Sequence, residues 1–292
     1  HDLFTNGILY LDLGFDLRTL PQEWLPYLPI FSRALLETGT HDLTFVQLLQ
    51  QIGQRTGGIY PTTLFSMSRH TRQAAAWLFL RGKAMTDQAA DLLAILKDVL
   101  TSARLQDRER IRQMVLENKA SMESGIVHAG HRVVNTRLKA RFTEADWAAE
   151  QTSGVSQLFF LRDLLGKIDS DWESVHQTLE SIRNALIQRS VTVCNITLDS
   201  ANWQKIRPLV EDFLGNLPQG QSSRHPWSTG KLPNLEGLSM PLQVNFVGKG
   251  GNLYEIGYAF HGSALVIVPY LRGSYLWEKV RVQGGAYGGF AV

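Results

Sequence analysis

The chain has 292 residues, of which 44% are hydrophobic and 19% are charged, and this composition excludes an intrinsically disordered protein. Its 29 basic and 27 acidic side chains are interspersed and leave a net charge of +2, so nothing indicates a nucleic-acid partner. No apolar stretch reaches the roughly 18 residues that span a bilayer, so no membrane segment is predicted. The length predicts two packed units.

Strands and helices alternate in the first hundred residues. Alternating and helical hydrophobic patterns predict, in chain order, a strand over Leu9–Leu17, a helix over Trp24–Glu37, a helix that ends before Gly57, strands over Ile59–Ser68 and Ala75–Lys83, and a helix from Asp87. Asp42 and Asp87 are the expected N-caps of the second and third helices, since a carboxylate accepts hydrogen bonds from the first free N–H groups of a helix.

From Asp107 onward the pattern is almost wholly helical. Apolar residues at helical spacing run from Ile111 to Ile126, and further helical patterns cover Glu144–Leu165 and Trp172–Gln188. No strand signal appears between about residues 87 and 190. The sequence therefore predicts a long helical extension after the first strands.

A second unit is expected to begin at residue 190, which divides the chain into 1–189 and 190–292. Its predicted elements are a strand over Val191–Leu198, a helix over Ala201–Leu217, a loop over Pro218–Pro241, strands over Leu242–Val247 and Tyr254–Phe260, a tight turn at Gly248–Gly251 between them, and a last helix up to about Val282. This order resembles a shortened first unit, so a weak repeat of architecture is predicted.

The two ends of the chain indicate a piece of a longer polypeptide. The first residue is His1 rather than Met, and the last residues, Phe290 to Val292, lie in what is predicted as an unfinished strand. The single cysteine, Cys194, lies in an apolar run, which favours a buried, unreactive thiol.

No complete catalytic set is present in the chain. A helical zinc site would require H-x-x-E-H or H-E-x-x-H, and neither motif occurs. The nearest pattern is His128-Ala-Gly-His131 with Glu123 upstream, where two ligands without a third form a weak site. We therefore predict no metal site in this chain, and we interpret the two histidines as solvated or as lying at the edge of the core.

Four stretches resemble the second half of the presequence proteases, in the branch of the pitrilysin-like, inverted-zinc-motif metallopeptidases that includes falcilysin. They are Thr5–Tyr10 (TNGILY), Gly53–Gly58 (GQRTGG), Val115–Ser124 (VLENKASMES) and Leu276–Phe290 (LWEKVRVQGGAYGGF). The last is the most specific, and the resemblance extends along essentially the whole chain.

The resemblance implies an α+β fold built from two-layer α/β units of the pitrilysin and mitochondrial-processing-peptidase type, with a long helical extension. Two halves of such enzymes enclose a chamber, and the zinc ion with H-x-x-E-H belongs to the first half. This chain would then be the third unit with its helical extension and the start of the fourth, and it would be inactive alone.

The resemblance also implies roles for Arg281 and Tyr287. In the family an Arg and a Tyr six residues later bind the substrate backbone beside the scissile bond, and these two residues have that spacing. An arginine offers a fixed fork of donors, and a tyrosine hydroxyl can donate to a tetrahedral intermediate. Without the resemblance, this spacing carries no meaning, and a Gly-Gly helix cap explains the stretch better.

The function implied is that of a zinc metalloendopeptidase that degrades short unstructured peptides, such as cleaved targeting sequences. Its partners would be those peptides and the N-terminal half of the same polypeptide, and its location the bacterial cytoplasm, the mitochondrial matrix or the plastid stroma. A non-catalytic structural or chaperone-like homologue of the same fold is the alternative. The presence of both Arg281 and Tyr287 argues against it.

Overall fold

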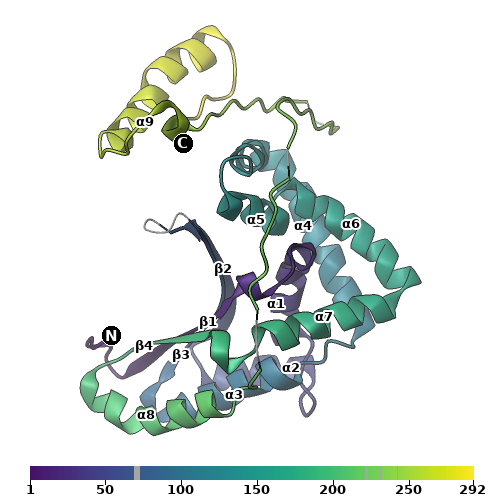
Figure 1. The fold of residues 1–292 in the computed structure, drawn as a ribbon, viewed down its shortest axis with the longest axis vertical. Helices are drawn as coiled ribbons and strands as arrows, with labels where there is room; N and C mark the ends of the chain where they lie inside the picture. Colours follow the sequence, from purple (N-terminus) through teal and green to yellow (C-terminus); the bar gives the residue numbers. More distant parts are fainter. Residues whose placement is uncertain (69–72, 221–222, 231, 242) are drawn as a thin grey trace. The chain divides into compact units, whose positions relative to one another are not determined.

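An antiparallel sheet forms the centre of the larger part of the chain. The computed structural model describes residues 1–68, 73–220, 223–230, 232–241 and 243–292. Contacts divide the chain into two compact units, His1–Lys249 and Gly250–Val292. In the first unit the strands are ordered β2-β3-β1-β4, with every neighbouring pair antiparallel (Figure 1). They are β1 Ile8–Asp16, β2 Ile59–Met67, β3 Ala74–Met85 and β4 Thr192–Thr197.

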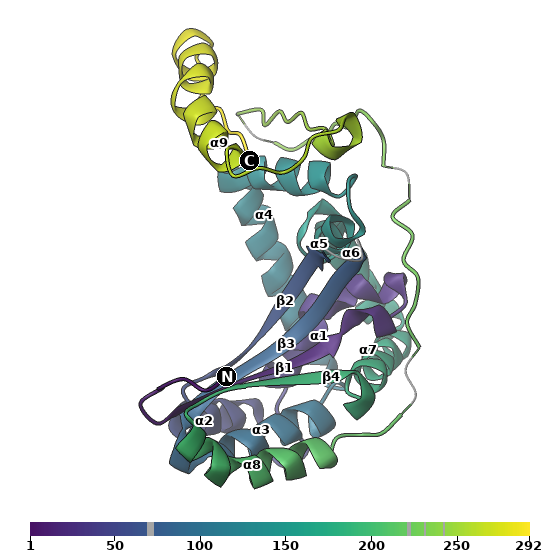
Figure 2. The ribbon, with the colours of Figure 1, turned by 60° about the vertical axis from the view of Figure 1, so that its left-hand side comes forward.

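The two faces of the sheet differ because side chains alternate along each strand. The odd-numbered residues of β1 from Leu9 to Phe15 are at most 1% exposed, whereas Tyr10 is 43% exposed. Helices cover the buried face on one side of the sheet (Figure 2). The helices of this layer are α1 Leu28–Glu37, α2 Phe45–Arg55, α3 Ala89–Ser102 and α8 Ser200–Gly215.

The opposite face of the sheet carries partly exposed aromatic side chains. Trp77 and Phe79 lie two residues apart on β3, and their rings stack with centroids 6.2 Å apart. The guanidinium of Arg81 lies 5.5 Å from the Phe79 ring centroid. Gly14 of β1 lies under the same ring, since a Cβ there would come within 2.6 Å of Phe79. This face combines apolar rings with a positive charge.

The predicted helices are present, but two of the predicted caps are wrong. Thr44, not Asp42, caps α2, and it forms a capping box in which the Thr44 amide donates to Gln47 Oε1 at 2.9 Å. Asp87 lies inside a 3₁₀ turn that precedes α3, and the N-cap of α3 is Gln88. Each helix therefore begins one or two residues later than predicted, because a 3₁₀ turn or a second capping residue intervenes.

The predicted helical extension is confirmed. Its helices are α4 Arg108–Lys139, α5 Glu144–Ser153, α6 Val155–Ser170 and α7 Trp172–Leu186. The side chain of Asp107 caps α4 by accepting from the amide of Arg110 at 3.0 Å. Helix α4 is kinked at Ala129, which has non-helical dihedral angles (φ −139°, ψ 36°). None of the described helices is both long and apolar enough to cross a membrane.

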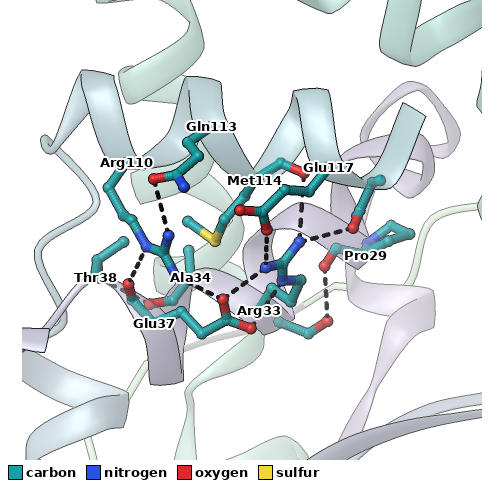
Figure 3. A network of polar contacts seen from close by, with 11 residues as sticks. Pro29, Arg33, Ala34, Glu37, Thr38, Arg110, Gln113, Met114 and Glu117 are labelled. Atoms are coloured by element: carbon teal, nitrogen blue, oxygen red, sulfur yellow. Dashed lines mark hydrogen bonds and ion pairs between the residues drawn. The ribbon is translucent and has the colours of Figure 1, made fainter. Parts of the chain in front are cut away.

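A network of charged side chains joins α1 to α4 (Figure 3). Arg33 of α1 donates to Glu37 at 2.7 Å and to Glu117 of α4 at 2.6 Å. Arg110 of α4 donates to Glu37 at 2.8 Å, so this carboxylate accepts from both helices. The hydrogen bond from Arg33 lowers the pKa of Glu117. Because these side chains are 17 to 43% exposed, the network orients α4 on α1 and adds modestly to stability.

Residues 218–249 form a connecting segment that has no helix or strand among its described residues, as predicted for Pro218–Pro241. It is nevertheless anchored on the first unit. Trp227 is 7% exposed, and its Nε1 donates to the carbonyl of Leu20 at 2.9 Å. The guanidinium of Arg18 lies 4.6 Å from the centroid of the Trp227 ring. Three residues earlier, Arg224 pairs with Asp16 at 2.8 Å.

Two further anchors tie the connecting segment to α4. Arg137 donates twice to Glu236, at 2.8 Å in each case, and lies 3.3 Å from the fully buried carboxylate of Glu150. Arg137 therefore joins a carboxylate of the segment to one in the interior. The ring of Phe246 occupies the space beside Gly130 that a Cβ would fill. The connecting segment is part of the first unit's packing.

The second unit consists of short helices. They are the 3₁₀ turn Leu253–Ile256, α9 Ala264–Gly273 and the π-helix η6 Trp277–Gln283, and they confirm the predicted last helix. Three strands were predicted here, over Leu242–Val247, over Tyr254–Phe260 and at the end of the chain. The described residues of these stretches form no strand, so the predictions are wrong for them, and Leu242 is not among the described residues.

The turn predicted at Gly248–Gly251 therefore does not connect two strands. The predicted repeat of the first unit's architecture is wrong as well, because its strands are missing from the described residues. A strand requires a neighbour for its hydrogen bonds, and the described residues of these stretches have none.

Strand β4 and helix α8, which follow residue 190, are part of the first unit. Strand β4 pairs with β1 from Thr192 to Thr197, and α8 packs against α3. The division into 1–189 and 190–292 stays a prediction, whereas contacts within this chain separate His1–Lys249 from Gly250–Val292. The fold is α+β, as predicted, because an antiparallel sheet and its helices occupy separate layers.

Candidate functional site

Arg281 and Tyr287 lie at the same pocket in the second unit. Arg281 is on η6, and Tyr287 is in the glycine-rich segment that follows. The pocket is open and has a volume of about 390 Å³. Its lining residues are Pro269, Arg272, Gly273, Trp277, Arg281, Tyr287, Gly288, Gly289 and Phe290. Whether the two predicted residues bind substrate stays a prediction.

Glycines turn the chain back after η6. Gly285 has φ +69°, a left-handed conformation that L side chains rarely adopt, and its amide donates to the carbonyl of Arg281 at 3.0 Å. The amide of Ala286 donates to the carbonyl of Val280 at 3.1 Å. These bonds close the helix end and reverse the chain, which returns Tyr287 to the side of the helix that carries Arg281.

The last residues lie close against η6. A Cβ on Gly289 would come within 3.0 Å of the Leu276 Cβ, so a larger residue there would push the segment away from the helix. Gly284 is similarly constrained, because a Cβ would come within 2.7 Å of the Val280 carbonyl oxygen. The glycines thus allow the backbone to approach the helix, and they leave the pocket wall without side chains at residues 288 and 289.

The pocket is positively charged and partly aromatic. The guanidinium carbon of Arg281 lies 4.4 Å from the centroid of the Trp277 ring, and that of Arg272 lies 5.9 Å from the Phe290 ring centroid. No carboxylate within residues 250–292 forms an ion pair with either arginine. Tyr287 is 89% exposed, so its hydroxyl is accessible to a ligand. Such a site can donate hydrogen bonds to carbonyl or carboxylate oxygens.

Sequence analysis did not single out Trp277 or Arg272. A signal for Trp277 was available in the motif itself, since Trp277 and Arg281 are four residues apart in a segment predicted to be helical. Arg272 gave no such signal. It lines the pocket because α9 ends at Gly273 and the chain turns before η6, and this break was not predicted.

The histidines of α4 do not provide a zinc site. Glu123, the nearest acidic residue, is paired with Arg162 at 2.7 Å, and His131 lies beside Phe246 with ring centroids 6.4 Å apart. The kink at Ala129 falls between His128 and His131 and disrupts the regular helical spacing. Throughout the described ranges, no group of three His, Cys, Asp or Glu side chains could hold a metal ion. The described residues therefore do not fit a zinc ion.

Cys194 on β4 is unpaired and partly buried. Burial raises the pKa of its thiol to about 11, and the nearby carboxylate of Asp12 contributes to that rise. The thiol is therefore protonated at neutral pH, which agrees with the interpretation of Cys194 as unreactive.

Comparison with known proteins covers both units of the chain. A profile for the region associated with peptidases of family M16, subfamily C, matches residues 1–164, and the profile described as "PreP C-terminal domain" matches residues 235–292. A solved protein from Enterococcus faecalis, described as a conserved protein, has a TM-score of 0.50 at 15% identity. It covers 76% of this chain and 51% of its own, and this similarity concerns the fold alone.

Curated relatives match the chain over nearly its whole length. Presequence protease 1 of Arabidopsis thaliana, chloroplastic/mitochondrial, is 41% identical over 99% of this chain and 27% of its own length. The mitochondrial presequence protease of Yarrowia lipolytica is 26% identical over 98% of this chain and 29% of its own length. The chain thus spans less than a third of these relatives. It belongs to subfamily C of the M16 peptidases, in the branch of the presequence proteases.

Proposed function

We propose that this chain is part of the C-terminal half of a zinc metalloendopeptidase that degrades short, unstructured peptides in a closed chamber. The observation that carries the proposal is the meeting of Arg281 and Tyr287 at one pocket in the segment that the PreP C-terminal domain profile matches. Relatives named presequence protease, which match the chain over nearly its whole length, support it.

Arg281 and Tyr287 would bind the peptide beside the bond that is cleaved. The guanidinium would donate to a backbone carbonyl oxygen of the substrate, and the hydroxyl of Tyr287 would donate to the oxygen that gains negative charge. Both side chains line an open pocket whose wall at Gly288 and Gly289 carries no side chain, so an extended backbone could approach. Donors placed in advance are most effective where charge develops in the transition state.

The metal would be held outside this chain. Membership in a metallopeptidase family implies a metal ion, and the described residues offer no site for one. We therefore assign to this chain the binding and orientation of the peptide. The zinc ligands and the general base would belong to the N-terminal half of the same polypeptide, so the isolated chain should lack peptidase activity.

The uncovered face of the sheet is the proposed wall of the chamber. Trp77 and Phe79 are stacked on this face, and Arg81 lies beside them. Tyr10 of β1 and Tyr60 of β2, 43% and 52% exposed, extend the aromatic surface. Such a surface can contact apolar side chains of an unfolded peptide without requiring one sequence. The organelles in the name of the Arabidopsis relative support a plastid or mitochondrial location, and a bacterial cytoplasm is the other proposed location.

The test uses the full-length polypeptide that carries this chain, with Arg281→Ala and Tyr287→Phe. We expect each change to lower kcat on the order of 10²-fold, since one transition-state donor is removed, while the zinc content is unchanged. Arg207→Ala and Tyr275→Phe are matched controls, because both residues are exposed and neither lines the pocket. Turnover at the unmodified rate in both site variants would refute the role of the pair and favour a structural homologue.

A further inference from the structure

We propose that Trp277 is a positioning residue that holds the guanidinium of Arg281 in the orientation that binds the peptide. The inference rests on the proposed function, because it concerns how one of its two donors is kept ready. The two residues are one helical turn apart on η6 and line the same pocket. The guanidinium carbon lies 4.4 Å from the centroid of the indole ring, well inside the range of a cation–π interaction.

The helical backbone places the two side chains on the same side of η6. Residues 277–283 form a π-helix, in which hydrogen bonds close between residues five apart. Residues four apart lie on the same side of such a helix, as they do on an α-helix. The spacing therefore allows the guanidinium of Arg281 to lie over the indole ring of Trp277, and the structure shows this contact.

Contact through the ring face leaves the donors of Arg281 available. A guanidinium has five N–H donors, and a cation–π contact with the face of a ring holds its charge without an oxygen acceptor. A carboxylate partner would occupy two of them. The carboxylate nearest in sequence is Glu278, which accepts a hydrogen bond from Gln283 Nε2 at 2.9 Å. Trp277 can therefore restrict the rotamers of Arg281 while its hydrogen-bonding edge remains open to substrate.

A role for Trp277 in the core of the second unit is not supported. Trp277 is 48% exposed, and η6 has no buried residue. The remaining alternative is that the indole ring contacts the peptide directly. The two roles differ in kinetics, because a group that orients a transition-state donor changes kcat, whereas one that contacts the substrate equally in both states changes KM.

The test compares Trp277→Phe with Trp277→Leu in the full-length polypeptide. The leucine lacks a π face, so we expect kcat to fall by about 10- to 100-fold with KM changed by less than about 3-fold. The phenylalanine retains a π face and should restore kcat to within about 3-fold of the unmodified value. In the double variant Trp277→Leu/Arg281→Ala, kcat should equal that of Arg281→Ala, since the indole acts only through the arginine. Tyr275→Leu is the matched control, because Tyr275 is exposed and does not line the pocket.

A second measurement examines the contact itself on the 292-residue chain. The side-chain N–H resonance of Arg281 should show a ring-current shift that persists in Trp277→Phe and disappears in Trp277→Leu. Three results would each overturn the positioning role. The first is an equal ring-current shift of Arg281 in all three chains. The others are additive losses of kcat in the double variant and an effect of Trp277→Leu that is confined to KM. If Arg281→Ala itself retains full turnover, the proposed function fails. If Arg281→Ala is impaired and Trp277→Leu is fully active, only the present inference fails.

Discussion

The connecting segment, residues 218–249, and the second unit, residues 250–292, follow one another in the chain but are held in opposite ways. The described residues of the connecting segment form no helix or strand, yet Trp227 is 7% exposed. The second unit forms helices, yet Leu265 and Val266 on α9 are 71% and 70% exposed. Side-chain burial, rather than regular hydrogen bonding of the backbone, therefore determines how firmly each segment is fixed.

The largest expected effect on stability comes from replacing a tryptophan in each of the two regions. Trp227→Ala should lower the free energy of unfolding of the first unit by roughly 3–5 kcal/mol, because a buried aromatic ring is lost and the Leu20 carbonyl loses its donor. Trp277→Ala, in the second unit, should leave that free energy unchanged, since Trp277 is 48% exposed. Urea unfolding followed by far-ultraviolet circular dichroism measures both. Equal effects of the two substitutions would show that the connecting segment is no better anchored than the second unit.

The alkylation rate of a thiol should also differ between the first unit and the second. At neutral pH Cys194 should react with iodoacetamide about 100-fold more slowly than a thiol with the ordinary pKa of 9.0, because its pKa is raised to about 11. In a Cys194→Ser chain, a new thiol from Ser263→Cys, which is exposed at the N-terminus of α9, should react at least at the ordinary rate. Alkylation rates measured from pH 7 to pH 11 by mass spectrometry test both. Equal rates would mean that the edge of the sheet opens readily.

The raised pKa of Cys194 also has a consequence for stability. The unfolded chain loses the thiol proton near pH 9, whereas the folded chain keeps it until about pH 11. Between these values the folded state binds more protons, so this group makes the free energy of unfolding fall as pH rises. The Cys194→Ser chain should lack that contribution, and an unchanged slope above pH 9 would show that the thiol is not buried in solution.

Replacing glycines on helix α4 should change stability by a smaller amount. A side chain at Gly130 would overlap the ring of Phe246, so Gly130→Ala should displace the end of the connecting segment and cost about 1–3 kcal/mol of stability. Gly125→Ala lies on the same helix with nothing within 4 Å of its Cβ, and it should stabilise the chain by roughly 0.5–1 kcal/mol. Opposite signs in urea unfolding would confirm the docking of Phe246 on α4, and two stabilising substitutions would contradict it.

The sequence predicted what depends on local pattern. The alternation in β1 and the helical spacing after Asp107 were sufficient, because burial of one face repeats with the period of the element. The pairing of β4 with β1 was not predicted, because it joins residues about 180 positions apart that no local signal connects. The prediction of a strand over Tyr254–Phe260 was wrong for a related reason, because these residues lie beside no other described strand with which they could pair.

The candidate site was predictable only in part. The spacing of Arg281 and Tyr287 became informative through a family resemblance, since an arginine and a tyrosine six residues apart carry no meaning alone. That the two line one pocket depends on the left-handed Gly285, which the Gly-Gly sequence did suggest. The π-helix was not predictable, because the same residues fit an α-helix equally well. The spacing of four residues allows Trp277 and Arg281 to meet in either helix, and the structure shows that they do.

Loss of the ion pair between Glu236 and Arg137, which holds the connecting segment on α4, should have the smallest effect on stability. Glu236→Gln removes a carboxylate that accepts two hydrogen bonds from Arg137, and we expect a loss of about 0.5–1 kcal/mol, since the pair is only partly buried. Glu211→Gln is the matched control, because its pair with Arg207 joins residues four apart on α8 and is more than half exposed. Its cost should be at most about 0.5 kcal/mol.

The pH dependence separates these two pairs further. The hydrogen bond from Arg137 lowers the pKa of Glu236 below its ordinary value of 4.5. The contribution of Glu236 is therefore complete above pH 4.5 and is lost as pH falls through the lower native pKa, because the unfolded state takes up its proton first. In Glu236→Gln the stability should fall less steeply between about pH 5 and pH 3 than in the unmodified chain. An identical acid slope in both chains would mean that Glu236 is not paired with Arg137 in solution.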